Sequence, residues 1–396
     1  VARNGVARPP TGQVGKLCPR RRAPRRAVVG SPGPCGSASM AQTPQNSKDS
    51  ASAPVVAVLG VGQMGLVCAS ILLDEDRTSA AEGSWTPPHV LMWGHSTQEV
   101  GDLMQSGKSD RLPGFRLPDA VRLCMKDADA LANASLIVSA IPVQFVRSVF
   151  ERLRPFVPAN VPIISVSKGI ENTTLLRPTQ AIAAALMDNP DKPARPLGTL
   201  SGPTVASELA RCLPATMVAA SDDDGLRQQI QALFTTRYLR VYPSADLLGV
   251  ELAGAAKNVI AIAAGVLDGL NAGYNAKSAL LGRGLAEIVR LGTAMGASSE
   301  TFYGIAGVGD LATTCFSPEG RNRSLGEALG KGKKLDDVLA RSRFVIEGVP
   351  TTRSIMDLSR KYKVEMPITQ AVNAVLFEGL DPIEAIGMLM TREMRS

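Results

Sequence analysis

The chain has 396 residues, 45% hydrophobic but only 4% aromatic, which allows a large aliphatic core and argues against a base-stacking surface. Residues 1–50 account for the whole net charge of +7, because they hold nine basic side chains and one acidic one; the remainder is near neutral, and no nucleic-acid partner is expected. Six scattered cysteines without a CxxC pair and only two histidines argue against a disulfide framework and against a metal site.

Residues 1–53 are rich in Arg, Pro, Gly and Ser and lack apolar periodicity, so they are predicted to be a disordered basic tail or an organellar transit peptide. Met40 is a candidate start, because the sequence opens on Val1. The expected location is cytoplasmic, or a plastid or mitochondrion if this segment is a transit peptide. No uninterrupted apolar run reaches the ~18 residues of a membrane span, so none is predicted.

From Val55 onward, short apolar runs rich in β-branched residues alternate with helical patterns. This alternation predicts an α/β fold, a Rossmann-type doubly wound parallel sheet. After Pro243 the strand patterns stop, and long helical patterns follow, clearest at 250–270 and 275–295. We therefore predict an NAD(P)-binding domain over 54–245 and an all-α substrate and catalytic domain over 246–396. The predicted strands are 55–59, 90–93, 136–141, 161–166, 216–220 and 239–242.

A GxGxxG motif at 60–65 follows the first predicted strand and opens a helix. Gly60 suits the tight turn, Gly62 the close approach of a pyrophosphate, and Gly65 the packing of helix on strand, which predicts a dinucleotide site. After the second strand, residues 93–96 contain no carboxylate to hold a ribose 2′-OH, so both NAD and NADP remain possible. His95 could contact the adenosine or be an ordinary loop histidine.

Lys257 is the most informative single residue, because it lies in a segment, 251–265, that is apolar on nearly all sides. A buried ammonium is costly without a partner or a function. Burial and a neighbouring lysine would lower its pKa toward the range of a proton donor. The alternative is a lysine whose stem is buried and whose ammonium reaches the surface.

Several further polar residues stand in glycine-rich or strand-terminal positions that could face a ligand. Asp310 could orient a catalytic ammonium, and the Arg321-Asn322 pair suits a phosphate. Each alone could equally be a cap, a turn or a surface charge. The other candidates of this kind are Lys168, Gly202 and Thr204.

The ordered set of motifs resembles the NAD(P)-dependent glycerol-3-phosphate dehydrogenases, closest to their bacterial-type branch, from about Val55 to the C-terminus. The motifs are GxGxxG at 60–65, SKGIE at 167–171, SGPT at 201–204, GAAKNVIAI at 254–262, GVGDLATTC at 307–315, GRNR at 320–323 and VIEG at 345–348. The resemblance implies reversible reduction of dihydroxyacetone phosphate, serving glycerolipid synthesis or redox balance, and a homodimer.

The resemblance also implies residue roles. Lys257 is the implied general acid and base, and Lys168 and Asp310 complete the catalytic group. The implied substrate-binding residues are Lys168, Gly202, Thr204, Lys257, Asp310, Arg321 and Asn322. With Gly60, Gly62 and Gly65, the implied cofactor-binding residues are Gln63, Met64, His95, Lys168, Ala206, Arg321, Val345 and Glu347.

The sequence departs from that family in three places. Gln63-Met64 replaces the usual Ser and aromatic residue, Gly320 replaces a Ser that donates a hydroxyl to the substrate, and residues 77–88 are longer than usual. Two alternatives stay open: a related two-domain dehydrogenase of the ketopantoate or hydroxyisobutyrate type, and a non-catalytic dinucleotide sensor. The sensor would not need Lys257, Lys168 and Asp310 together.

Overall fold

The computed structural model describes residues 53–77, 86–187 and 194–391. Residues from Pro54 onward cluster as one compact unit. The predicted tail at 1–53 and most of the predicted insertion at 77–88 lie outside the described residues, so both stay predictions.

The α/β half is built on one eight-stranded sheet with the order β3-β2-β1-β4-β5-β6-β7-β8. The order reverses between β1 and β4, which creates the crevice where ligands bind in doubly wound sheets. The strands are β1 (Val55–Leu59), β2 (His89–Trp93), β3 (Arg122–Cys124), β4 (Leu136–Ser139), β5 (Ile163–Ser165), β6 (Leu197–Ser201), β7 (Ala215–Ser221) and β8 (Leu239–Ser244).

The predicted fold class is confirmed, with one correction to the strand directions. β6 and β7 pair antiparallel, while all other neighbours are parallel, so β7 and β8 run against the rest. The β6–β7 connection holds only the four-residue helix α6 (Ala206–Leu209), which is too short to act as a full crossover helix. The sequence prediction missed β3, which has three residues, and β6, whose Gly198 and Thr199 weaken the apolar pattern.

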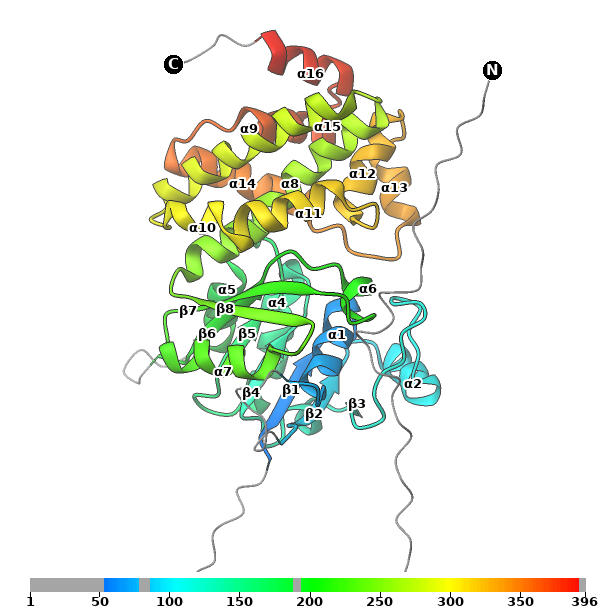
Figure 1. Cartoon of the computed structure of the whole chain (residues 1–396), viewed down its shortest axis with the longest axis vertical. Helices are drawn as coiled ribbons and strands as arrows, with labels where there is room; N and C mark the ends of the chain where they lie inside the picture. Colours follow the sequence, from blue (N-terminus) through cyan, green and yellow to red (C-terminus); the bar gives the residue numbers. More distant parts are fainter. Residues whose placement is uncertain (1–52, 78–85, 188–193, 392–396) are drawn as a thin grey trace, which may run out of the picture. The chain divides into compact units, whose positions relative to one another are not determined.

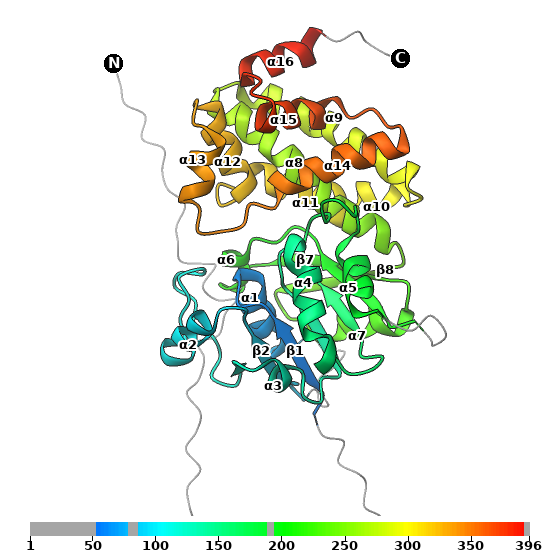
Figure 2. The same ribbon diagram turned by 180° about the vertical axis from the view of Figure 1, so that it is seen from behind.

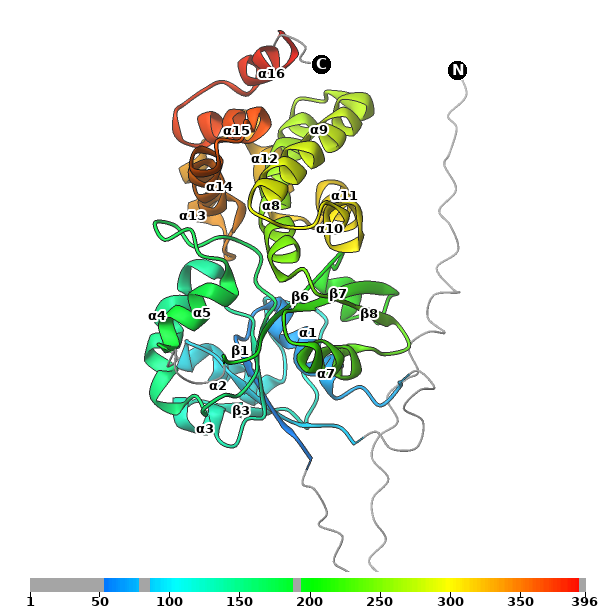
Figure 3. The same cartoon turned by 90° about the vertical axis from the view of Figure 1, so that its left-hand side faces the viewer.

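Helices cover both faces of the sheet, as Figure 3 shows edge-on. One face packs against α1 (Gln63–Leu72), α2 (Thr97–Ser106) and α7 (Asp224–Phe234). The other packs against α3 (Asp127–Leu131), α4 (Val143–Leu153) and α5 (Pro178–Leu186), with the short turn η3 (Arg154–Phe156) after α4. The buried central strands β1 and β4 are apolar on both sides, as their β-branched runs predict.

The helical half is organised around α8 (Leu247–Gly269), seen above the sheet in Figures 1 and 2. Among the described residues, α8 is the one helix long and apolar enough to cross a membrane, but 94% of its apolar window is buried inside the fold. It is therefore the core helix of this half, and its neighbours cover it. They are α9 (Gly273–Ala294), α10 (Ser299–Tyr303), the π-helical turn η4 (Ile305–Gly309), α11 (Asp310–Phe316), α12 (Arg321–Gly330), α13 (Leu335–Arg341), α14 (Gly348–Tyr362), α15 (Pro367–Phe377) and α16 (Pro382–Thr391).

The backbones of α8 and α12 lie in direct contact, and glycines on both helices permit it. A Cβ placed on Gly265 would lie 1.9 Å from the carbonyl oxygen of Arg323, and one on Gly326 would lie 1.9 Å from that of Ile262. Only residues without a side chain allow the two backbones to touch in this way. The contact holds α12 against the C-terminal half of α8, which continues from the turns that carry Lys257.

Candidate active site

The glycine motif forms the turn between β1 and α1, at the point where the strand order reverses. Gly60 has φ of +117°, and a Cβ there would lie 2.6 Å from the Ala140 carbonyl oxygen. A Cβ on Gly65 would lie 1.9 Å from the Gly60 carbonyl oxygen, so both positions require glycine. Gly62 directly precedes α1 and has no side chain that could bind the amides of the first turn. No atom lies within 4 Å of its Cβ position, so an anion can reach the N-terminus of the helix.

A cleft opens between the carboxyl end of the sheet and the helical half. Most of the residues predicted to form the site line it together. Gly202 and Asp310 lie just behind the cleft and bind its lysines. His95 is exposed beyond the end of β2 and does not line this cleft. The predicted residues that line it are Gln63, Met64, Lys168, Thr204, Ala206, Lys257, Arg321, Asn322, Val345 and Glu347.

Lys257 projects from α8 and is only 5% exposed, as its apolar surroundings predicted. Its Nζ lies 2.5 Å from Oδ1 of Asp310 and 2.6 Å from Oγ1 of Thr314. Burial, opposed by Asp310 and reinforced by Lys168, lowers the pKa of Lys257 to about 8. Its ammonium is therefore held in place and can release its proton near neutral pH.

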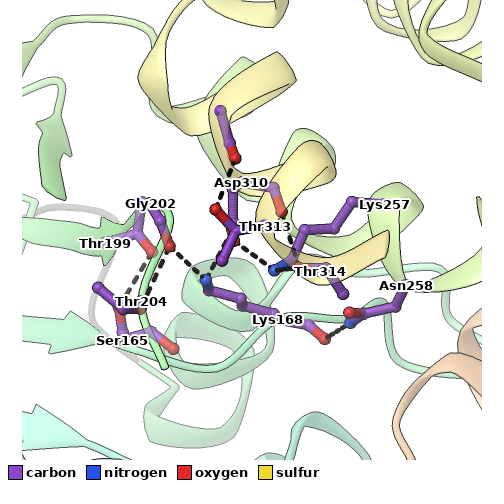
Figure 4. Close-up of polar contacts among 11 residues, drawn as sticks. Ser165, Lys168, Thr199, Gly202, Thr204, Lys257, Asn258, Asp310, Thr313 and Thr314 are labelled. Atoms are coloured by element: carbon purple, nitrogen blue, oxygen red, sulfur yellow. Dashed lines mark hydrogen bonds and ion pairs between the residues drawn. The ribbon is translucent and has the colours of Figure 1, made fainter. Parts of the chain in front are cut away.

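Asp310 joins the two lysines of the site, as Figure 4 shows. It is the first residue of α11, directly after the π-helical turn η4, and is 1% exposed. Its second oxygen, Oδ2, accepts a hydrogen bond of 2.7 Å from Nζ of Lys168, which also donates to the Gly202 carbonyl at 2.9 Å. Two ammonium groups thus share one carboxylate, which leaves the group with a net positive charge beside the cleft.

Asn258, next to Lys257 on α8, donates from Nδ2 to the Lys168 carbonyl at 3.0 Å. Thr314 accepts from Lys257 and donates to the Asp310 carbonyl at 2.7 Å. Neither residue was assigned a role in the site from the sequence. The signal for Thr314 was its position four residues after Asp310, which places both side chains on one helix face.

Arg321 and Asn322 begin α12 at the other side of the cleft. Oδ1 of Asn322 accepts a hydrogen bond of 3.0 Å from the Gly348 amide, which turns its Nδ2 away from that partner. Among the described residues no acceptor pairs with this Nδ2. Arg321 donates to the Val345 carbonyl at 3.1 Å and lies over the Phe344 ring at 5.7 Å. Both side chains can therefore offer donors to an anion.

Glu347 connects the two halves of the chain. Its Oε1 accepts a hydrogen bond of 3.1 Å from the amide of Val143, the first residue of α4. Burial raises the pKa of Glu347, while the Val143 amide, Arg321 and Lys168 oppose the increase. A carboxylate at this helix N-terminus holds the rim of the cleft against the α/β half.

The two departures in the cleft have visible structural consequences. The side chain of Gln63 donates from Nε2 to the Arg111 carbonyl at 2.8 Å, so it fixes the neighbouring loop. Gly320 precedes α12 without any side-chain cap, and a Cβ there would lie 3.1 Å from the Thr314 carbonyl oxygen. The first turn of α12 therefore keeps backbone amides that a serine would have capped.

Two family models match the chain in order. The model for the N-terminal part of NAD-dependent glycerol-3-phosphate dehydrogenase matches residues 55–227, and the model for the C-terminal part matches 246–387. The chain belongs to the NAD-dependent glycerol-3-phosphate dehydrogenase family. The family predicted from the motifs is thus confirmed, together with its activity as an NAD(P)-dependent glycerol-3-phosphate dehydrogenase.

Individual relatives support this assignment. A glycerol-3-phosphate dehydrogenase (NAD(P)+) of Macrococcus caseolyticus is 42% identical over 339 residues, which cover 85% of this chain and 98% of the relative. The crystal structure of a glycerol-3-phosphate dehydrogenase from Coxiella burnetii superposes with a TM-score of 0.78 at 32% identity, over 86% of this chain and 99% of that one. A ketopantoate reductase from Ralstonia eutropha has a TM-score of 0.52 at 15% identity, over 84% of this chain and 99% of that one, a likeness of fold alone.

Proposed function

We propose that this dehydrogenase reduces dihydroxyacetone phosphate to sn-glycerol 3-phosphate, reversibly, with Lys257 as the general acid. The observation that carries the proposal is the buried Lys257–Asp310–Lys168 ion network at the edge of the cleft. A structural ion pair needs one lysine and one carboxylate. A second lysine on the same carboxylate leaves a positive charge that suits an anionic substrate and a developing alkoxide.

The cofactor site fits a dinucleotide. The first turn of α1 behind Gly62 suits the pyrophosphate, and Gln63, Met64, Ala206, Val345 and Glu347 line the adjoining cleft. A bound nicotinamide supplies or accepts the hydride.

The proton step is assigned to Lys257. Its Nζ holds the proton, and Asp310 and Thr314 fix the direction in which it points. The proton passes to the carbonyl oxygen as the carbonyl carbon receives hydride, and neutral Lys257 remains hydrogen-bonded to its two partners. In the oxidative direction Lys257 takes the proton from the hydroxyl group. Lys168 holds the substrate oxygens by charge, with Gly202 keeping its ammonium in position.

The phosphate end of the substrate is assigned to the first turn of α12. Arg321 offers a planar pair of donors, and Asn322 offers its Nδ2. Thr204, whose hydroxyl donates to the Gly202 carbonyl at 3.2 Å, lines the opposite wall. The uncapped amides after Gly320 add donors where a serine would otherwise stand.

The test is cofactor oxidation on addition of dihydroxyacetone phosphate, with NADH and NADPH in parallel. We expect Lys257→Met to lower turnover by ~10²–10⁴-fold, because general acid catalysis contributes about that much, while NADH binding measured by fluorescence is retained. Lys277→Met is the matched control: Lys277 is likewise 5% exposed and paired to an aspartate, Asp268, but it does not line the cleft.

Turnover of the Lys257→Met enzyme close to that of the Lys277→Met enzyme would remove the assignment of Lys257. Cofactor binding without turnover of any small carbonyl substrate would favour a dinucleotide sensor. A substrate panel in which ketopantoate replaces dihydroxyacetone phosphate would favour a dehydrogenase of the ketopantoate type.

The wider arrangement is also proposed here. Residues 54–245 would act as the NAD(P)-binding domain and 246–396 as the substrate domain, with the boundary in the turn before α8. Exposed apolar side chains on α16, Ile383, Met388 and Met390, support a homodimer, which size-exclusion chromatography with light scattering would test. The proposed role is glycerolipid synthesis or redox balance in the cytoplasm, or in a plastid or mitochondrion if residues 1–53 are a transit peptide.

A further inference from the structure

A second cleft adjoins the first, at the carboxyl end of β2. Val61 of the glycine turn, Ser96 after β2 and Arg111 line it, and Arg343 and Phe344 close it from the helical half. Gln63 connects the two clefts: it lines the first, and its amide binds the Arg111 carbonyl in the wall of the second. A dinucleotide that rests its pyrophosphate on α1 extends toward this end of β2, where Rossmann folds hold the adenosine ribose.

The end of β2 carries neither of the groups that usually choose between NAD and NADP. An NAD-selective site has an aspartate or glutamate there, but this chain has His95 and Ser96. The Ser96 hydroxyl caps α2 by accepting a hydrogen bond of 3.2 Å from the Glu99 amide, so it keeps one neutral O–H donor for a ligand. A single neutral hydroxyl is a weak partner for the charge of a 2′-phosphate, so a guanidinium partner has to come from elsewhere in the wall of the second cleft.

The basic residues in that wall are not equivalent. Arg111 is held by both oxygens of Glu99, so its charge is already matched. Arg343 is exposed and, within the described part of the chain, forms no ion pair. A guanidinium matches a phosphate monoester through two parallel hydrogen bonds. The exposed carboxylates of Asp102 and Asp110 also line the cleft, but solvent screens them, and Lys108 offsets part of their charge.

The connection between α13 and α14, residues 342–347, places Arg343 there. Arg321 anchors it twice, through the Val345 carbonyl at 3.1 Å and through the Phe344 ring at 5.7 Å. As a result Val345 and Glu347 line the first cleft, and Arg343 and Phe344 line the second. The connection between α13 and α14 thus contributes residues to both clefts.

We propose that Arg343 binds the 2′-phosphate of NADP(H), with Phe344 beside the adenosine, so that the cofactor is selected by the helical half and not by the loop after β2. This inference rests on the proposed function for the position of the dinucleotide. It makes Arg343 a specificity-determining residue that leaves the chemical step unchanged.

The test compares wild-type enzyme, Arg343→Gln and the control Arg341→Gln, an exposed arginine two residues earlier that does not line the second cleft. For Arg343→Gln we expect kcat/KM with NADPH to fall about 10-fold or more, the usual size for a lost charged hydrogen bond, and kcat/KM with NADH to change less than about 2-fold. Arg341→Gln should change neither value.

Calorimetry with 2′,5′-ADP and 5′-AMP measures the same subsite without turnover, so the result separates this inference from the proposed function. We expect the wild-type protein to bind 2′,5′-ADP more tightly than 5′-AMP, and Arg343→Gln to lose that preference. Equal affinity of the wild-type protein for the two nucleotides would overturn the inference. An unchanged preference in the variant would also overturn it, even in an enzyme that is fully active with dihydroxyacetone phosphate.

Discussion

Replacing Asp310 by asparagine would remove the one carboxylate that sits between two ammonium groups. The carboxylate favours the charged form of Lys257, whose pKa burial and Lys168 hold at about 8. Without it, both remaining influences lower the pKa of Lys257, so the neutral form gains. The reduction needs protonated Lys257, and its rate therefore falls as pH rises through this pKa. We expect the alkaline limb of the Asp310→Asn profile to move to lower pH.

The size of that shift follows from the contact distance. Two unit charges about 4 Å apart interact by about 4 kcal/mol at an effective dielectric constant of about 20, which is roughly 3 pH units. Relaxation of Lys168 and entry of water reduce this value, so a shift of about 1–3 units is expected. The Asp310 oxygens lie 2.5 and 2.7 Å from the two lysines, so the geometry is close enough for the full effect.

The assay is kcat for reduction as a function of pH, with saturating cofactor, for wild type, Asp310→Asn and Asp268→Asn. Asp268 is the matched control, because it also pairs with a buried lysine, Lys277 at 2.8 Å, and with Arg323 at 2.7 Å, but lies outside the cleft. Its variant should keep the wild-type profile. An alkaline limb of Asp310→Asn that coincides with wild type would refute the claim that Asp310 sets the proton affinity of Lys257.

Two further predictions concern α12. Arg321→Ala should raise the KM for dihydroxyacetone phosphate about 10-fold or more, because a charged hydrogen bond to phosphate is lost; an unchanged KM in steady-state kinetics would remove its phosphate role. Gly326→Ala should lower the melting temperature and raise the same KM, because its Cβ would lie 1.9 Å from the Ile262 carbonyl oxygen and force α12 away from α8 at a cost of about 1–3 kcal/mol. Gly282→Ala is the control, because this helical glycine has nothing within 4 Å of the new Cβ, and we expect a neutral or stabilising effect. Equal melting temperatures for the two variants would contradict this account of the helix contact.

Much of the fold could be predicted from the sequence, because the central strands are buried on both sides. Continuous β-branched runs such as Val55–Leu59 are a strong signal, and the apolar surroundings of Lys257 predicted its burial correctly. The direction of β7 was not predictable from such runs, since parallel and antiparallel buried strands have the same composition. Direction depends on the connection, and a four-residue helix is a weak pattern.

The site was predictable where chemistry restricts the choice of residue and unpredictable where contact depends on tertiary structure. A lysine in an apolar helix needs a carboxylate, and Asp310 was the candidate that the structure brings to it. The contact of Glu347 with the Val143 amide joins residues 204 positions apart, and no local pattern signals it. Arg343 had no signal either, because an exposed arginine in a loop is ordinary until its surroundings are known.

The glycine contact between α8 and α12 also has a consequence for how this enzyme can vary over evolution. The spacing between the proton donor and the first turn of α12 is set where main chain meets main chain, at Gly265 and Gly326, so no rotamer or side-chain volume enters into it. Conservative exchanges among the surrounding aliphatic residues can then accumulate without altering that spacing. Substitutions elsewhere in the core would therefore leave the distance between Lys257 and the first turn of α12 unchanged. Substitutions at the two glycines would change it.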